Sequence, residues 1–469
     1  MKLKTNCPEF YNDISESIRA FLEVPVIELT ETDDFDINII ETQEDGQIKT
    51  TTEYNGFTGV YSATIEQTDE ISIKRLKKHV VKLSVYYCLK KATGINLPWG
   101  SLTGIRPTKL LRDVKSIEIL NNKYDLPLKK GELLKRIIDN QTPYYVPKED
   151  EVDVYIGIPF CKTRCTYCSF SSTDSTKGEK LMIPYVKALI KEIEDTASLI
   201  KTLNKKVRCL YIGGGTPTAL TTPLFKDMLQ CTCMHFNPKM EFTVEAGRPD
   251  TIDEEKLRLI KKAGADRISI NPQSMNENTL KKVGRSHSPK EIINCYKMAR
   301  QIGFKTINAD LIAGLPEETP DMFFYSLEEV LKLKAENITV HTLALKRGSK
   351  MSEENTVFAN IKEVQQMVEG AQEILINNGY EPYYLYRQKY MTGNFENIGY
   401  AIKGHTGIYN IDIMEETTDI IALGCGGVSK RVIKEEDRLE RAFNFKSIYE
   451  YIQRIDEANL RKKQLFEIN

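Results

Sequence analysis

From Val152 onward, short apolar runs alternate with longer segments in which apolar residues recur at helical spacing. Short apolar runs bounded by turn residues are typical of buried strands, and the longer segments are typical of helices that pack on them. The pattern predicts strands at residues 152–158, 207–212, 240–245, 267–271, 306–311 and 338–343. It predicts helices at residues 184–203, 252–263, 289–302 and 321–333.

Six successive strand–helix units imply parallel strands joined by right-handed crossovers. The fold class expected is therefore α/β, with an incomplete six-unit (β/α) barrel of the TIM type. Functional residues in such a barrel lie at the carboxyl ends of the strands. The residues that follow each predicted strand are consequently the first place to search for chemistry.

The first ~150 residues have a different texture, with short strands separated by acidic or glycine-containing turns. Strands are predicted at residues 24–29, 36–41, 47–54 and 59–67, followed by a helix at 70–93 and a helical stretch that ends near Asn140. Pro143, Pro147 and the charged residues 148–151 are typical of a linker. We expect a small α+β domain at 1–147, the barrel at 148–380 and a C-terminal extension at 381–469.

The composition narrows the class of protein further. Of 469 residues, 41% are hydrophobic and 28% charged, and the net charge is −1, so no nucleic-acid partner is expected. No apolar run reaches the length of a membrane span, and the first residues lack an apolar signal core. We therefore expect a cytoplasmic protein whose ten cysteines are reduced.

Three of the cysteines directly follow the first barrel strand. Cys161, Cys165 and Cys168 have the spacing C-x-x-x-C-x-x-C, which lets one loop provide three thiolates to an iron–sulfur cluster. Three ligands leave one iron open, and that iron can take the amino and carboxylate groups of a ligand such as S-adenosylmethionine. The alternative is a zinc site, which would need a fourth ligand nearby. The nearest histidines, His79 and His235, are far away in sequence.

The remaining seven cysteines show no repeated metal spacing. Cys231 and Cys233 form the only other close pair, and such an isolated pair is interpreted as buried apolar side chains or surface thiols.

Polar or glycine residues also follow the other predicted strands. Taken singly, each is as easily a capped loop or an ordinary ion pair. Together they predict a site for a ligand with an amino acid end and a ribose. The residues are Gly213–Gly215 with Thr216, then Glu245, Gln273, Arg285 and Asp310.

In their order along the chain, these segments resemble the radical-SAM superfamily, in the branch of oxygen-independent coproporphyrinogen III oxidase. Residues 102–109, 384–389 and 394–400 extend the resemblance to the long, HemZ-type members, usually called coproporphyrinogen dehydrogenase. It implies cluster ligands at Cys161, Cys165 and Cys168. It also implies S-adenosylmethionine contacts at Tyr155, Gly215, Thr216, Glu245, Gln273, Arg285 and Asp310.

The same resemblance implies an activity and its partners. A 5′-deoxyadenosyl radical would abstract hydrogen from propionates of coproporphyrinogen III, and two decarboxylations would give protoporphyrinogen IX in haem biosynthesis. A reduced flavodoxin or ferredoxin would supply the electron. The carboxylates of this porphyrinogen need cations, and the candidates are Lys162, Arg164, Arg347 and Arg387.

Three positions depart from the branch. Phe170 stands where the oxidase has a fourth cysteine, and only residues 430–469 follow the segment 424–429, so we expect a shortened C-terminal helical domain. Glu396–Asn397 stands where the haem-chaperone relatives have His–Asn. Two alternatives therefore stay open. One is a haem-binding, chaperone-like protein that keeps the cluster, with His341 and Tyr400 as retained candidates. The other is a radical-SAM enzyme that acts on another tetrapyrrole or carboxylated substrate.

Overall fold

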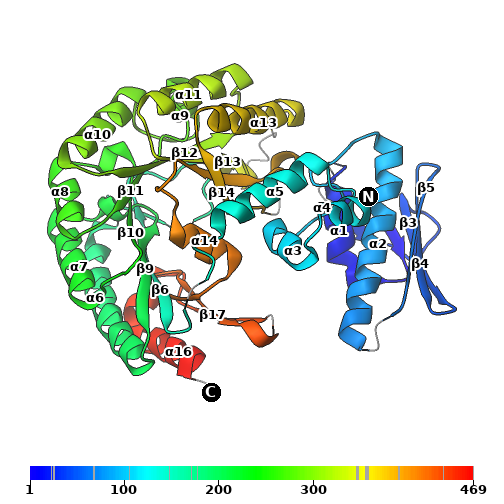
Figure 1. Cartoon of the computed structure of the whole chain (residues 1–469), viewed down its shortest axis with the longest axis horizontal. Coiled ribbons are helices and arrows are strands. Elements are labelled where there is room, and N and C mark those ends of the chain that lie inside the picture. Colours follow the sequence, from blue (N-terminus) through cyan, green and yellow to red (C-terminus); the bar gives the residue numbers. More distant parts are fainter. Residues whose placement is uncertain are drawn as a thin grey trace. The chain divides into compact units, whose positions relative to one another are not determined.

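A computed structural model provides the structure of the chain. It describes residues 1–467 except 23, 25–26, 67–68, 105, 147, 171, 177, 345–347, 354–358, 389–390 and 437. The chain divides into two compact units (Figure 1). The first comprises Met1–Lys135 and Gly393–Phe395, and the second comprises Arg136–Thr392 and Glu396–Asn469.

The first unit is a five-stranded sheet with helices on one face. The strand order is β2-β1-β3-β4-β5, with β1 parallel to its neighbours and β3 to β5 antiparallel. Leu3, Ile37, Ile14 and Val81 join sheet and helices in one buried core. The elements are β1 Lys2–Thr5, α1 Tyr11–Arg19, β2 Glu28–Leu29, β3 Ile37–Glu44, β4 Gln47–Tyr54, β5 Phe57–Thr64, α2 Glu70–Thr93, α3 Pro107–Val114, α4 Ile117–Tyr124 and α5 Leu128–Gln141, the last of which crosses the unit boundary.

Local sequence explains why the strand at 47–54 and the helix at 70–93 were predicted at their observed limits. Asp45–Gly46 and Asn55–Gly56 have positive φ angles, as tight turns between antiparallel strands require, and they fix the register of β3, β4 and β5. Asp69 caps the start of α2 by accepting from Ser72 N, and Gly94 ends it in the left-handed conformation. The strand β1 and the helix α1 were not predicted.

The second unit is built on an eleven-stranded sheet. Its strand order is β14-β15-β13-β12-β11-β10-β9-β6-β16-β17-β18. The run from β13 to β16 is parallel, while β14, β15, β17 and β18 are antiparallel strands at the two edges. The strands are β6 Glu151–Ile158, β9 Lys206–Gly214, β10 Glu241–Gly247, β11 Arg267–Ile270, β12 Thr306–Ala313, β13 Asn337–Thr342, β14 Glu381–Tyr386, β15 Asn397–Ala401, β16 Asp419–Leu423, β17 Val428–Ile433 and β18 Arg438–Phe443.

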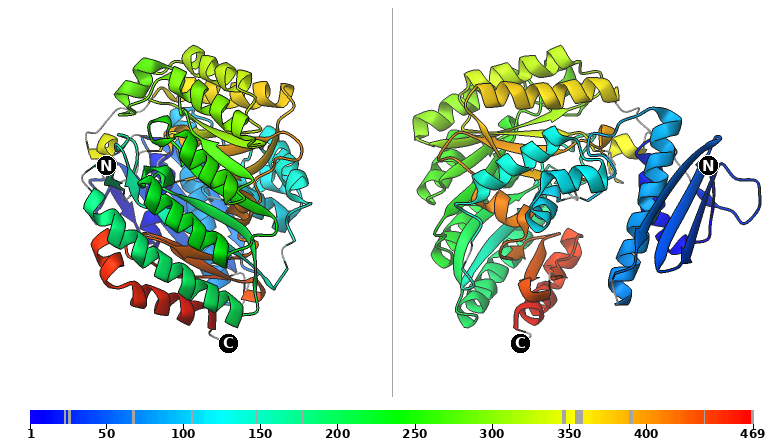
Figure 2. Two further views of the ribbon diagram at one scale, coloured as in Figure 1. Left: turned by 90° about the vertical axis from the view of Figure 1, so that its left-hand side faces the viewer. Right: turned by 45° about the vertical axis from the view of Figure 1, so that its right-hand side comes forward.

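Helices cover the outer face of this curved sheet, and α14 lies on its inner side (Figures 1 and 2). Because both faces are covered, the central strands are buried almost throughout, as in β6, where only Tyr155 is partly exposed. The helices are α6 Glu179–Thr202, α7 Thr222–His235, α8 Glu254–Lys262, α9 Glu277–Lys282, α10 Pro289–Ile302, α11 Pro320–Lys332, α12 Lys350–Glu353, α13 Ile361–Asn377, α14 Ile408–Glu415, α15 Ile448–Gln453 and α16 Ile455–Glu467.

The α/β fold class with an incomplete barrel is confirmed, but the parallel run has seven strands where six were predicted. The seventh, β16, pairs with β6 in parallel, from Asp419↔Val152 to Leu423↔Ile156. It was missed because the antiparallel strands β14 and β15 interrupt the strand–helix alternation before it. Residues 381–469, set apart above as an extension, therefore add strands to the same sheet, and the domain limits at 147 and 380 stay predictions.

A buried ionic network closes the amino-terminal end of the barrel. Arg208 on β9 donates from Nε to Asp412 of α14 at 2.8 Å, from Nη1 to Glu151 at 3.1 Å and from Nη2 to the Tyr144 carbonyl at 2.7 Å. Every nitrogen of this 5%-exposed guanidinium therefore has a partner. The network fixes α14 against the starts of β6 and β9.

None of the helices in the described part of the chain has both the length and the apolar character needed to cross a bilayer.

Candidate active site

The three cysteines of the predicted cluster loop lie just beyond the carboxyl end of β6. Cys161 lies in β7 (Phe160–Cys161), which pairs with β8 (Thr173–Asp174). Thr173 N donates to Pro159 O at 2.8 Å, and Ser175 N donates to Cys161 O at 2.7 Å. Backbone bonds thus close the loop at its base, and all three cysteines are partly exposed.

The spacing of the sulfurs fits a cluster better than one zinc ion. All three cysteines are described residues, yet their Sγ atoms do not all lie within 4.8 Å of one another. A zinc ion with Zn–S bonds of about 2.3 Å would hold tetrahedral sulfurs only about 3.8 Å apart. In a [4Fe–4S] cluster the three sulfurs bind three different irons and are farther apart.

The segment Gly213–Gly214–Gly215 packs against this loop from the end of β9. Gly214 has φ +113°, and a Cβ there would lie 2.7 Å from Ile158 N. At Gly215 a Cβ would lie 2.7 Å from Phe160 O and 2.9 Å from Cys161 Sγ. The glycines are needed because the backbone of β9 approaches the cluster loop so closely.

Thr216 continues this contact, since its hydroxyl donates to Cys161 Sγ at 3.6 Å. Gly215 and Thr216 therefore lie beside Cys161 of the predicted cluster loop.

Glu245 lies at the end of β10, where its carboxylate faces β9. Tyr211 Oη donates to Glu245 Oε1 at 2.6 Å, and a Cβ on Gly213 would lie 3.0 Å from the same carboxyl group. Burial raises the pKa of Glu245 to about 7, and the charge of Asp310 adds to this, while the bond from Tyr211 opposes it. The carboxyl group is therefore poised to gain or lose a proton near neutrality.

Asp310 on β12 has the opposite electrostatic balance. Burial alone would raise its pKa, but His341 and the donors Asn308 and Thr339 outweigh burial and lower the pKa. Asn308 Nδ2 donates to Asp310 Oδ1 at 2.8 Å, and His341 Nε2 lies 3.7 Å from Oδ2. Glu245 and Asp310 thus differ in charge near pH 7, although each lies in the second half of its strand.

Gln273 follows β11 in a conformation that non-glycine residues rarely adopt. Its φ is +67°, and its backbone bridges β11 to β12 through bonds to Asp310 O at 2.8 Å and from Ile312 N at 3.0 Å. Such strain persists where surrounding contacts impose it, and it concentrates at functional sites.

Arg285 joins the end of β11 to the cluster loop. It donates to the Tyr167 hydroxyl at 3.1 Å and to Asn271 O at 2.8 Å. Among the described residues, its buried Nε and the buried Oδ1 of Asn271 have no hydrogen-bond partner. Buried polar atoms without partners are rare and point to a missing ligand or water. The site therefore retains hydrogen-bonding capacity beside Tyr167, a residue of the predicted cluster loop.

Tyr155 lies one step further into the barrel. Its ring stacks with Tyr211 at a centroid distance of 6.2 Å and with Tyr409 of α14 at 6.4 Å. Burial and the charge of Glu245 raise the pKa of Tyr155, so its hydroxyl stays protonated. Glu245 contacts this stack through the hydroxyl of Tyr211. The sequence analysis did not predict a place in the site for Tyr211 or Tyr409.

Arg248 is a further residue that the sequence analysis missed. It follows β10 and is 5% exposed. Its Nη1 donates to Thr163 O at 2.8 Å, its Nη2 donates to the Thr163 hydroxyl at 2.8 Å, and Asp250 holds the guanidinium. Nη1 also lies 3.9 Å from Cys165 Sγ. Arg248 therefore anchors the cluster loop, and its place directly after a barrel strand was the signal that could have revealed it.

Of the four cations predicted to bind carboxylates of the substrate, two contact the protein itself and one lies outside the described residues. Lys162 donates to Asp250 O at 3.1 Å and Arg164 to Gly348 O at 2.5 Å, so both brace the cluster loop. Arg387 is 8% exposed, and Arg347 lies outside the described residues.

The two retained haem-ligand candidates are already engaged or buried. His341 Nδ1 lies 3.4 Å from the Tyr386 hydroxyl, and its other nitrogen faces Asp310. Tyr400 is only 1% exposed. Asn397 accepts from Thr342 N at 3.0 Å and Glu396 O accepts from the Thr342 hydroxyl at 2.8 Å, so this pair fastens β15 to β13.

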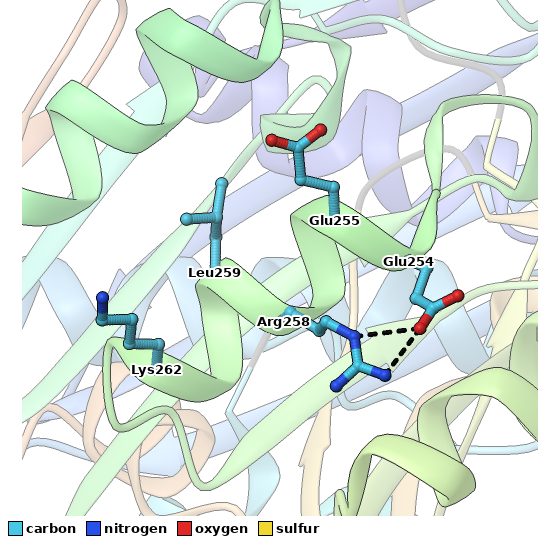
Figure 3. A pocket seen from close by; sticks show the side chains of 5 residues that line it. All are labelled: Glu254, Glu255, Arg258, Leu259 and Lys262. Atoms are coloured by element: carbon cyan, nitrogen blue, oxygen red, sulfur yellow. Dashed lines mark hydrogen bonds and ion pairs between the residues drawn. The ribbon is translucent and has the colours of Figure 1, made fainter.

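Elsewhere, a shallow surface pocket lies along α8 (Figure 3). Glu254, Glu255, Arg258, Leu259 and Lys262 line it, and Arg258 Nη2 donates to Glu254 Oε1 at 2.6 Å. An exposed ion pair four residues apart on one helix is an ordinary surface feature.

Comparison with known proteins agrees with this geometry. Residues 155–330 match the Radical SAM superfamily model. The chain is similar to the oxygen-independent coproporphyrinogen-III oxidase-like protein HemZ of Bacillus subtilis (strain 168), with 39% identity over 92% of this chain and 91% of that protein. It is also similar to the heme chaperone HemW of the same organism, with 35% identity over 44% of this chain and 52% of that one.

Among solved structures, the chain resembles coproporphyrinogen III oxidase HemN from Escherichia coli. The TM-score is 0.53 and the identity 22%, over 69% of this chain and 72% of that one, which is a likeness of fold. The superfamily match confirms the two predicted cofactors, a [4Fe–4S] cluster and S-adenosylmethionine. The assignment of individual residues to them stays a prediction.

Proposed function

Because the chain belongs to the radical SAM superfamily and, within it, to the family of the HemZ protein, we propose that it oxidatively decarboxylates coproporphyrinogen III. Two propionate side chains would become vinyl groups, which gives protoporphyrinogen IX without oxygen. The observation that carries this proposal is the 39% identity to HemZ over nearly the whole of both chains. We place the reaction in the cytoplasm, with reduced flavodoxin or ferredoxin as electron donor.

Cys161, Cys165 and Cys168 would hold the cluster and leave one iron for S-adenosylmethionine. Arg248 would keep the loop in place through Thr163, and Thr216 would donate to the Cys161 sulfur. When bound, the two cofactors supply the 5′-deoxyadenosyl radical that takes the hydrogen atom.

The remaining strand-end residues would position the cofactor. Arg285 has unused donor capacity beside Tyr167 and suits the carboxylate of S-adenosylmethionine. Glu245 and Asp310 offer carboxylates to its ammonium and ribose hydroxyl groups. Gly215 lets the ligand approach the backbone because it has no side chain.

The substrate would lose a hydrogen atom from the β-carbon of a propionate, then CO2, then one electron to an external one-electron acceptor. The protein's task is to hold the propionate near the radical and to exclude water. Arg387 is the remaining described cation candidate for a substrate carboxylate.

An anaerobic assay of reconstituted protein with dithionite, S-adenosylmethionine and coproporphyrinogen III tests the proposal. Expected products are 5′-deoxyadenosine, CO2 and a vinyl-bearing porphyrinogen, detected by mass spectrometry. If 5′-deoxyadenosine forms without CO2 or vinyl product, the substrate is another tetrapyrrole or carboxylated compound. If Cys165→Ala still cleaves S-adenosylmethionine, the cluster assignment is wrong.

A second candidate is a haem-binding, chaperone-like function, which the 35% identity to HemW favours. It predicts stoichiometric haem binding with a Soret band and no turnover of porphyrinogen. The engagement of His341 with Asp310 and Tyr386 and the burial of Tyr400 leave these two side chains poorly placed as haem ligands. A haem titration of the wild type distinguishes the two functions, because only the second predicts a Soret band.

A further inference from the structure

A second group of metal-ligating side chains lies on the outer helices, away from the strand ends. Cys231 and His235 are four residues apart on α7, so they face the same side of that helix. Glu194 projects from the neighbouring helix α6. The Cys231 sulfur, a ring nitrogen of His235 and a carboxylate oxygen of Glu194 all lie within 4.8 Å of one another.

We propose that Glu194, Cys231 and His235 bind a zinc ion that links α6 to α7. Thiolate, imidazole and carboxylate are the three ligand types that zinc takes in proteins. Three protein ligands with water in the fourth tetrahedral position is the arrangement of open zinc sites, and the exposure of Glu194 and His235 gives that water access. Zinc–ligand bonds of about 2.0–2.3 Å require the atoms to move only slightly closer. Glu194 and His235 are exposed, so rotation of their side chains allows this movement.

The site belongs to the amino-terminal end of the barrel. His235 is the last residue of α7, and the chain then returns to the start of β10 at Glu241. Glu194 lies in the second half of α6, which leads to the start of β9. The zinc site is therefore remote from the cluster loop, which follows the carboxyl end of β6. At this end of a barrel, a bound ion stabilises the fold and takes no part in the chemistry.

A second group of three potential ligands is buried and does not suit a metal ion. Asp153, Cys209 and Asp412 also lie within 4.8 Å of one another, but all three are buried. Arg208 already supplies the positive charge there, at 2.8 Å from Asp412. In the trio on α6 and α7, Glu194 and His235 are exposed instead, and no cation in the described part of the chain pairs with Glu194.

The test uses protein that carries its reconstituted cluster, so that the loop cysteines cannot bind zinc. After incubation with zinc sulfate and dialysis against zinc-free buffer, the zinc and iron contents of the protein are measured by mass spectrometry. One zinc ion per chain should remain in addition to the iron of the cluster. The bound zinc should raise the unfolding temperature of the protein. His235→Ala and Cys231→Ala should lose it, and Glu194→Gln should weaken binding by at least about 10-fold.

Cys233→Ser is the matched control, because Cys233 is the neighbouring exposed thiol on α7 and donates to Ala263 O at 3.3 Å. It should retain zinc, and all variants should still cleave S-adenosylmethionine. The proposal is overturned if wild type keeps no zinc beyond its cluster. It is also overturned if His235→Ala keeps as much zinc as wild type, or if Cys233→Ser loses it. His235 is exposed, so its loss leaves folding intact and that result decides the matter.

Discussion

The two ends of the barrel both contain buried arginines, but their hydrogen bonding differs. At the amino-terminal end, each nitrogen of Arg208 has a partner, and two carboxylates neutralise its charge. At the carboxyl end, Arg285 has the same burial but no carboxylate partner, and its Nε lacks a hydrogen bond within the described residues. The protein alone therefore completes the hydrogen bonding of Arg208, whereas Arg285 keeps a donor that a ligand could use.

The largest effect is expected from Arg208→Met. Removal of the guanidinium leaves Glu151 and Asp412 buried without their cation, which costs about 3–5 kcal/mol of unfolding free energy. Urea unfolding followed by circular dichroism measures this loss. A cost below about 1 kcal/mol would mean that the network at this end is as incomplete as the one around Arg285.

Arg285→Lys tests the role of the buried arginine at the carboxyl end of the barrel. Lysine keeps the charge but loses the planar fork that reaches both Tyr167 and Asn271. We expect S-adenosylmethionine to bind about 10–100-fold more weakly, equivalent to about 1.4–2.8 kcal/mol, with little loss of stability. Equilibrium dialysis with cluster-loaded protein measures the affinity. Strong destabilisation with unchanged affinity would assign Arg285 to the same structural role as Arg208.

Glu245 gives the carboxyl end a pH dependence. Its folded pKa of about 7 lies above the unfolded value of 4.5. The unfolded chain releases this proton first, so the unfolding free energy falls as the pH rises from about 4.5 to 7, by up to about 3 kcal/mol, and then levels. Over the same range the growing carboxylate should strengthen S-adenosylmethionine binding.

Glu245→Gln should remove both trends. Paired urea titrations and binding isotherms at several pH values between 5 and 8 provide the measurement. A wild-type affinity that does not change across pH 7 would show that the carboxylate of Glu245 makes no charge-dependent contact with the ligand.

The smallest effect is expected from Arg258→Ala on α8. Its ion pair with Glu254 is exposed, with 64% and 60% of the two side chains accessible, so its loss should cost at most about 0.5 kcal/mol. S-adenosylmethionine cleavage should be unchanged. A clear loss of this cleavage would instead show that the pocket along α8 (Figure 3) contributes to activity.

Much of the fold could be predicted because local signals mark the elements. The helix at 289–302 was predicted at its observed limits, since Ser288 and Glu291 form a capping box and Gly303 ends the helix in the left-handed conformation. The strand β16 could not be found this way, because its partner β6 lies in a distant part of the sequence.

The same distinction applies to the sites. Residues that directly follow a strand could be singled out from the pattern alone. The contacts of Arg248 with Thr163, and the proximity of Glu194 to Cys231, depend on how separate elements pack. Side-chain spacing within one segment carries no information about such neighbours.

The pairing of β16 with β6 has a consequence for the synthesis and folding of the chain itself. The two strands are about 270 residues apart in sequence, so β6 must wait for almost the whole chain before its second edge is covered. Until then, an apolar strand edge next to the cysteine loop is open to other chains. A nascent chain stalled before residue 419 should therefore depend on chaperones and aggregate readily, whereas release of the last 50 residues should end that dependence.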